Sequence, residues 1–281
     1  MSALLMGDGN RINLNQLEAI PVPRATQSWS PIPWKPFVDI ICHRIERAGW
    51  MITSVDLLVS GFDKETGLPG ELYGTIILDG GDGATVPQLA FRISYNKKYA
   101  AAVCGGMHVT VCSNGMFVGE YQLVMRKQTT HARRDIVPLI EQGVGRIQSA
   151  YDTTRRQRDT LQSVPLSLDE GYGLIGRAIG NNVITPTMAN VAFTDWRKPR
   201  HEEHGNDTAW GLYNCFTEGV KKARAGVLMD AHTSINRFFV DQVTAPAAAY
   251  GDQSKLPTVE EVFSPDFVRP TLEELDRFSR F

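Results

Sequence analysis

The sequence predicts an α+β fold, in which an antiparallel meander of about five strands packs against helices. Three observations favour this class. Apolar residues recur at helical spacing before residue 50 and again after residue 134. Between these segments, runs rich in Val, Ile, Leu, Tyr and Phe are divided by turn residues, as is typical of strands. The connections between these runs are short, whereas parallel strands need long crossovers.

Residues 1–36 are predicted to form an extended arm, because they end in a proline-rich stretch and proline fixes φ and removes a backbone donor. A helix is expected to follow from Pro36, a residue that suits the first turn. Its apolar stripe includes Ile41 and Ile45, and Gly49 lies just past its expected end.

Five segments after this helix have the composition of strands. The run from Asp79 to Gly83 has no Lys-Ser/Thr after it, so it is interpreted as a hairpin turn rather than a phosphate loop. The Asn114-Gly115 pair favours a two-residue type I′ turn. The predicted strands are Thr53–Phe62, Glu71–Leu78, Val86–Tyr95, Met107–Ser113 and Met116–Val124.

Helical spacing returns in residues 134–158 and is strongest in residues 208–242, where Asp207 is a candidate cap. Residues 165–205 show no clear period and are expected to form loops and short elements. The predicted organisation is an arm (1–36), a single α+β core domain (37–243), and a linker with a short helical tail (244–281). The tail contains two Thr-x-x-Glu capping boxes, at Thr258 and Thr271.

The composition indicates a folded protein of the cytoplasm. Hydrophobic residues make up 42% of the chain and the formal net charge is −2, so any nucleic-acid site must concentrate its cations locally. The four cysteines form no C-x-x-C pair, which favours free thiols in a reducing compartment. No signal segment or membrane span is visible.

No pattern of residues indicates an enzyme. The two histidines of the His201–His204 segment are three residues apart rather than four, which makes a metal site the weaker interpretation. Cys112 has no partner histidine by spacing, and no carboxylate pair stands out as an acid/base set. The sequence therefore predicts no catalytic residue, no metal site and no cofactor.

Basic residues concentrate where the sheet passes into the next helix. Residues 121–160 hold eight basic and four acidic groups, whereas residues 241–281 hold four basic and eight acidic ones. Guanidinium groups match phosphate geometry, and phosphate neutralisation dominates nucleic-acid affinity. The alternative is an ordinary solvated helix, whose last arginines, including Arg158, complement the macrodipole. The candidate phosphate ligands are Arg126, Lys127, Arg133, Arg134 and Arg156.

A second cluster interleaves rings with cations at the end of the third predicted strand. Binding of unpaired nucleic acid needs both, because rings stack on bases and cations follow the phosphates. Strand alternation puts Phe91 and Tyr95 on one face and Arg92 on the other. Since one face must be core, a half-buried hairpin is the alternative interpretation. The candidates in this cluster are Arg92, Tyr95, Lys97, Lys98 and Tyr99.

Four sequence pieces together resemble an uncharacterised domain family of phages and plasmids. They are Ser94–Asn96, Val111–Asn114, His131 and the Trp210–Glu218 segment, and they span roughly residues 90–222. The chain departs from the family at Tyr95 and Lys97-Lys98, where members usually have His-Asp-Gly. The resemblance implies a phage or mobile-element origin.

The overall character of the chain also resembles the Drc-type cofactors, single-stranded-DNA-binding proteins of podoviruses. That resemblance implies cooperative coating of single strands and help in bringing a phage RNA polymerase to its promoters, which would place the protein in the host cytoplasm. Self-association is expected from the proline-rich arm and the capped tail, because terminal segments can dock onto a neighbouring subunit. Two alternatives remain open. One is a single-strand annealing or recombination mediator, and the other is a protein-interaction module without DNA binding.

Overall fold

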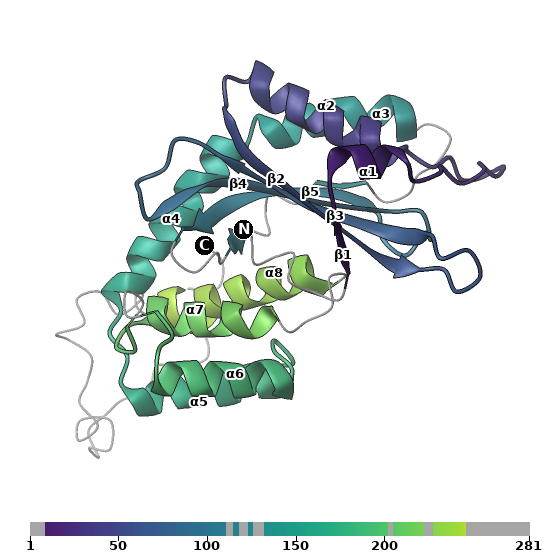
Figure 1. The fold of residues 1–281 in the computed structure, drawn as a ribbon. Helices are drawn as coiled ribbons and strands as arrows, with labels where there is room; N and C mark the ends of the chain where they lie inside the picture. The colour runs from purple at the N-terminus through teal and green to yellow at the C-terminus, as the bar shows by residue number, and fades with distance from the viewer. Residues whose placement is uncertain are drawn as a thin grey trace, which may run out of the picture.

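An antiparallel sheet forms the middle layer of the molecule (Figure 1). The computed structural model describes residues 9–110, 115–117, 123–125, 132–201, 205–221 and 227–245. Neighbouring strands follow the order β1-β2-β3-β4-β5-β6, and β7 also pairs with β5. The α+β class and the antiparallel meander are therefore confirmed. The strands are β1 Asn10–Ile12, β2 Ile52–Phe62, β3 Pro69–Leu78, β4 Thr85–Ser94, β5 Ala101–Val109, β6 Gly115–Phe117 and β7 Leu123–Met125.

The two faces of the sheet differ in chemistry. On β4, Leu89, Phe91 and Ile93 point into one apolar core. Because side chains alternate along a strand, Gln88 and Arg92 point to the opposite face. We call these the apolar face and the polar face; the polar face also carries apolar residues, among them Ala90 and Cys104, that pack into the core of the helical layer. Burying each large apolar side chain contributes about 1.5–3 kcal/mol, so the apolar face is the main source of stability in this half of the molecule.

Three helices cover the apolar face (Figure 1). They are α1 Leu14–Glu18, α2 Trp34–Arg47 and α3 Ala132–Val144. The predicted stripe of α2 is buried, including Ile41 and Ile45, and Gly49 follows the helix with a φ of +87° that favours glycine. The arm is less extended than predicted. Its first described residues form β1, and Asn13 then caps α1 in a capping box with Gln16.

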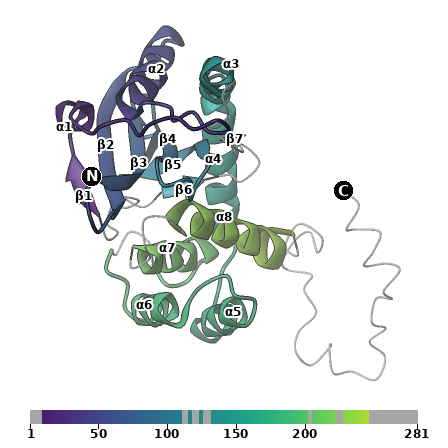
Figure 2. The same cartoon turned by 90° about the vertical axis from the view of Figure 1, so that its right-hand side faces the viewer.

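The remaining helices lie at the edge of the sheet and below its polar face (Figures 1 and 2). α4 Ile147–Ser163 leads from the sheet to α7 Ala209–Val220 and α8 Leu228–Phe239, which a π-helical turn, Val240–Thr244, extends. α5 Leu168–Gly180 and α6 Pro186–Arg197 form a further layer. Every residue of α7 is buried, because α7 packs against α4, α6 and α8.

Several elements differ from the prediction. Residues 165–205 contain two full helices, α5 and α6, instead of loops and short elements. The helix predicted over 134–158 is two helices, which meet near Gly145. Thr208, rather than Asp207, caps α7. The predicted capping boxes at Thr258 and Thr271 lie outside the described residues.

Candidate nucleic-acid interface

The connection between β4 and β5, residues 95–100, places cations beside rings at one end of the sheet. The Lys97 ammonium lies 4.8 Å from the centroid of the Trp29 ring. The Lys98 ammonium lies 5.0 Å from the centroid of Tyr99. Both lysines are exposed and both rings are half-buried. A cation within about 6 Å of a ring centroid is attracted by the ring's quadrupole, so each pair is held in place.

A buried carboxylate fixes the shape of this connection. Glu71 accepts hydrogen bonds from Tyr73 Oη at 2.7 Å, Asn96 Nδ2 at 3.0 Å and Lys98 Nζ at 3.0 Å. Ser60 Oγ donates a fourth, at 3.1 Å. Burial alone would raise the pKa of Glu71, but the hydrogen bonds from Tyr73, Asn96 and Lys98 outweigh it and lower the pKa below its ordinary value. Glu71 is therefore charged at neutral pH and anchors both ends of the turn.

Lys97 has a strained backbone, with a φ of +62°. A residue with a Cβ in the left-handed region costs roughly 1–2 kcal/mol relative to a right-handed one, and glycine avoids this cost. Asn96 Oδ1 accepts the Lys98 amide at 3.1 Å and supports the turn. The sequence keeps a lysine at this position although glycine would suit the backbone better.

Arg92, the next predicted residue, is already paired. Its Nη1 lies 3.0 Å from Asp230 Oδ2 on α8, and its guanidinium carbon lies 5.1 Å from the centroid of Tyr99. The Arg92 side chain is 13% exposed, and its Nε is buried without a hydrogen-bond partner. Arg92 thus joins the sheet to the helical layer, beside the ring that Lys98 also contacts.

The predicted base-stacking role of Tyr95 does not fit its position. Tyr95 is 7% exposed and continues the apolar face of β4. Its ring stacks on Trp34 of α2 with centroids 4.1 Å apart, and its hydroxyl accepts the Trp34 amide at 3.0 Å. The alternation along β4 is as predicted, but the tyrosine lies on the face that α2 covers.

The described side chains do not bring the other predicted residues to the β4–β5 connection. Arg156 is exposed on α4, where it donates to Thr153 Oγ1 at 3.3 Å. Arg126 and Lys127 lie outside the described residues, and for Arg133 and Arg134, in the first turn of α3, only the backbone is described. β7 ends with Met125 opposite Ala101, at the same end of the sheet as the turn.

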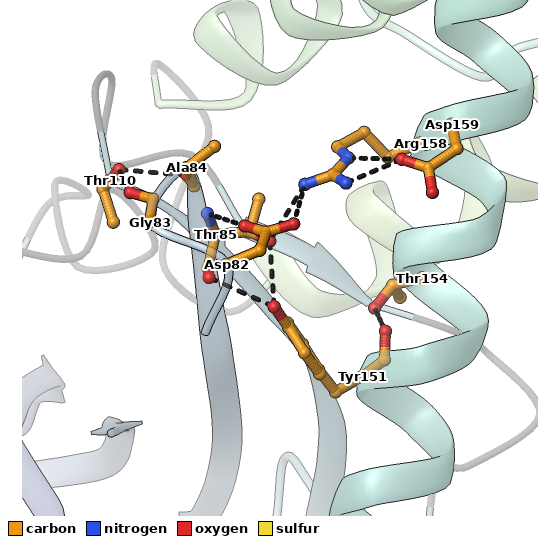
Figure 3. Close-up of polar contacts among 9 residues, drawn as sticks. All are labelled: Asp82, Gly83, Ala84, Thr85, Thr110, Tyr151, Thr154, Arg158 and Asp159. Atoms are coloured by element: carbon orange, nitrogen blue, oxygen red, sulfur yellow. Dashed lines mark hydrogen bonds and ion pairs between the residues drawn. The ribbon is translucent and has the colours of Figure 1, made fainter. Parts of the chain in front are cut away.

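Arg158, which belongs to the predicted basic excess, is engaged in the fold (Figure 3). Its guanidinium lies 2.7 Å from Asp82 Oδ2 and 2.6 Å from Asp159 Oδ1. Tyr151 Oη donates to the Thr85 carbonyl at 3.1 Å. These contacts fasten α4 to the hairpin turn between β3 and β4, which the sequence correctly predicts. Arg158 therefore stabilises the fold and is not available to a phosphate.

Two accessible rings near the turn were not predicted. Trp29 comes from the proline-rich arm and reaches Lys97 across the fold. Phe62, which is 42% exposed, pairs with Pro69 at the end of β2. The next residue, Gly70, accepts the Tyr95 amide through its carbonyl oxygen at 2.7 Å. No local pattern marks either ring, because their proximity to the turn is set by the sheet register and the path of the arm.

Among the described residues, no group of three or more His, Cys, Asp and Glu side chains is arranged to hold a metal ion. No helix in the same ranges is long and apolar enough to cross a membrane.

Comparison with known proteins identifies a family but no function. No curated protein and no solved structure matches the chain. A family model described as a domain of unknown function, DUF932, matches residues 47–254. This match covers most of the α+β core and agrees with the resemblance to an uncharacterised domain family. The chain is therefore a member of the DUF932 family.

Proposed function

We propose that this protein binds unpaired DNA, and that the strand passes over the β4–β5 connection. The observation that carries the proposal is the pairing of two exposed lysines with two half-buried rings, Lys97 with Trp29 and Lys98 with Tyr99. Stacking on such rings contributes about 1–3 kcal/mol per base, and ammonium groups release counterions from the phosphates.

Two further observations support this site. Lys97 has a strained φ of +62°, and backbone strain concentrates at functional positions. The exposed Phe62 offers a further ring at the same end of the sheet. The net charge of −2 provides no long-range attraction, so these local groups must supply the affinity.

The finer roles stay predictions from the sequence and its resemblances. They are a phage origin, cooperative coating, assistance to an RNA polymerase, self-association and a location in the host cytoplasm. The alternatives differ in outcome. An annealing mediator accelerates pairing of complementary strands, whereas a coating protein slows pairing or leaves it unchanged. A protein-interaction module shows no salt-sensitive binding to an oligonucleotide.

The test is a titration of the full chain into fluorescent oligothymidylate at several salt concentrations, followed by anisotropy. Lys97→Gln with Lys98→Gln is expected to weaken binding about tenfold or more. The slope of log K against log salt is expected to fall by about 1.4, since each contact to a single strand contributes about 0.7. Glutamine is used because a glutamate at position 98 would repel Glu71.

The matched control is Arg177→Gln with Arg197→Gln, on α5 and α6, which changes the net charge equally in a different layer. It is expected to bind like the unmodified protein. The proposal is wrong if the unmodified protein shows no salt-sensitive binding, or if both double variants lose affinity equally.

A further inference from the structure

The ion pair between Arg92 and Asp230 leaves part of the hydrogen-bonding capacity of the guanidinium unused. Asp230 contacts Nη1 through one oxygen at 3.0 Å, while Nε is buried and has no hydrogen-bond partner. Arginine binds carboxylates and phosphates best in bidentate fashion, through two parallel N–H donors. A buried donor left unpaired is destabilising. The observed pair is therefore a suboptimal arrangement for Arg92.

The surroundings of Arg92 fit a nucleotide. Its guanidinium lies 5.1 Å from the Tyr99 centroid, and the Lys98 ammonium lies 5.0 Å from the same centroid. A phosphate at Arg92 would thus lie beside the ring proposed to stack on a base. A phosphate also presents several acceptor oxygens, so at the position of Asp230 it can accept from the two terminal nitrogens, Nη1 and Nη2, in an end-on bidentate contact.

We propose that Asp230 is an internal substitute for a strand phosphate, and that Arg92 is a phosphate ligand which Asp230 holds until a strand displaces it. This inference rests on the proposed function and adds its regulation. In the free protein, α8 and the polar face of the sheet are joined through this pair. Binding of a DNA strand breaks this ion pair, and Arg92 then makes a bidentate contact to a phosphate of the DNA.

Displacement of Asp230 requires little rearrangement of the core. The Asp230 side chain is 56% exposed, so its carboxylate is already largely hydrated and can leave Arg92 without being drawn out of the core. Asp230 also lines a cavity of about 690 Å³ between α8 and the connection from α5 to α6, together with Asn182, Thr185 and Ser234. The carboxylate therefore has open space beside these polar side chains to enter when it leaves Arg92.

The decisive variant is Asp230→Asn, in the same oligothymidylate titration of the full chain. Removal of the competing carboxylate is expected to tighten binding about three- to tenfold. The slope of log K against log salt is expected to stay unchanged or to become steeper by up to about 0.7. Asp169→Asn is the matched control, because Asp169 is also an exposed acid in the first turn of a helix, α5. It is expected to bind like the unmodified protein.

A second variant tests the role of Arg92. Arg92→Lys in the Asp230→Asn background keeps the charge but removes the bidentate fork, so the gain in affinity should disappear. A thermal melt of each variant checks that it is folded. If the unmodified protein binds but Asp230→Asn brings no gain, or if Asp169→Asn brings the same gain, the regulation by Asp230 is wrong and the proposed function stands. If no protein binds, both are wrong.

Discussion

The buried carboxylate of Glu71 is the shared hydrogen-bond acceptor of several polar side chains at the candidate interface. It is 4% exposed and accepts hydrogen bonds from Ser60, Tyr73, Asn96 and Lys98. Glu71→Ala leaves these donors without their shared acceptor, so we expect a loss of about 2–4 kcal/mol of unfolding free energy, measured by urea denaturation at pH 7. Glu71→Gln should lose less, because its amide oxygen still accepts.

The exposed Glu65 of the β2–β3 hairpin is the control, and Glu65→Ala should change stability by less than about 0.5 kcal/mol. Because the folded pKa of Glu71 is lowered, its contribution is present above the unfolded pKa and is lost as pH falls through the folded pKa. An equal loss for Glu65→Ala and Glu71→Ala would contradict the anchoring role.

At the scale of elements, α4 packs so closely on β5 at Gly105 that this position has no space for a side chain. A Cβ built at Gly105 would lie 2.9 Å from the Ala150 Cβ. Gly105→Ala is therefore expected to destabilise the protein by about 1–3 kcal/mol in thermal or urea unfolding. Ala150→Gly in the same chain removes the clash, and should recover part of this loss despite the cost of about 1 kcal/mol for a helical glycine.

Gly173 on α5 provides the comparison, since a Cβ there meets nothing within 4 Å. Gly173→Ala should be neutral or should stabilise by up to about 1 kcal/mol. Absence of any recovery in the Gly105→Ala, Ala150→Gly double variant would show that helix packing does not explain the glycine.

The sequence predicts those elements whose residues follow a local pattern, and it is less accurate where tertiary packing determines the residues. Strands β2 to β4 alternate branched and polar residues, and their predicted bounds are nearly correct. β5 begins at Ala101 rather than at the predicted Met107. Its first half is rich in Ala and Gly, which strand propensity disfavours, and at Gly105 the close approach of α4 explains the small residue. The caps of α5 and α6, Ser167 with Glu170 and Thr185 with Pro186, are local signals, but glycines obscure the period of α5.

The sequence predicts the local part of the candidate interface but not the contacts that depend on tertiary packing. Composition places Lys97, Lys98 and Tyr99 at a turn, and the structure has them there. Alternation separates Tyr95 from Arg92 but does not reveal which face α2 covers, so Tyr95 was assigned to the wrong environment. The contact of Trp29 with Lys97 depends on the path of the arm, which no local spacing encodes.

For the whole molecule, two buried histidines make stability depend on pH. Burial lowers the pKa of His108 on β5 and of His232 on α8 to about 4 in each case. Unfolded histidine has a pKa of about 6.5, so between these values the unfolded chain binds protons that the folded chain excludes. Stability is therefore full above about pH 6.5 and falls as pH decreases, with a limiting slope of about 2.7 kcal/mol per pH unit for two sites.

Urea denaturation at pH 6.5 and pH 5 should show this fall. The window separates the histidines from Glu71 and Asp82, whose pKa values are lowered and which titrate at lower pH. Asp195, whose pKa burial raises, acts in the opposite direction because the folded state takes up its proton first. His108→Gln and His232→Gln should each remove about half of the histidine-dependent slope, whereas His43→Gln, at an exposed position of α2, should leave it intact. A slope unaffected by both buried substitutions would mean that other groups control the acid sensitivity of the fold.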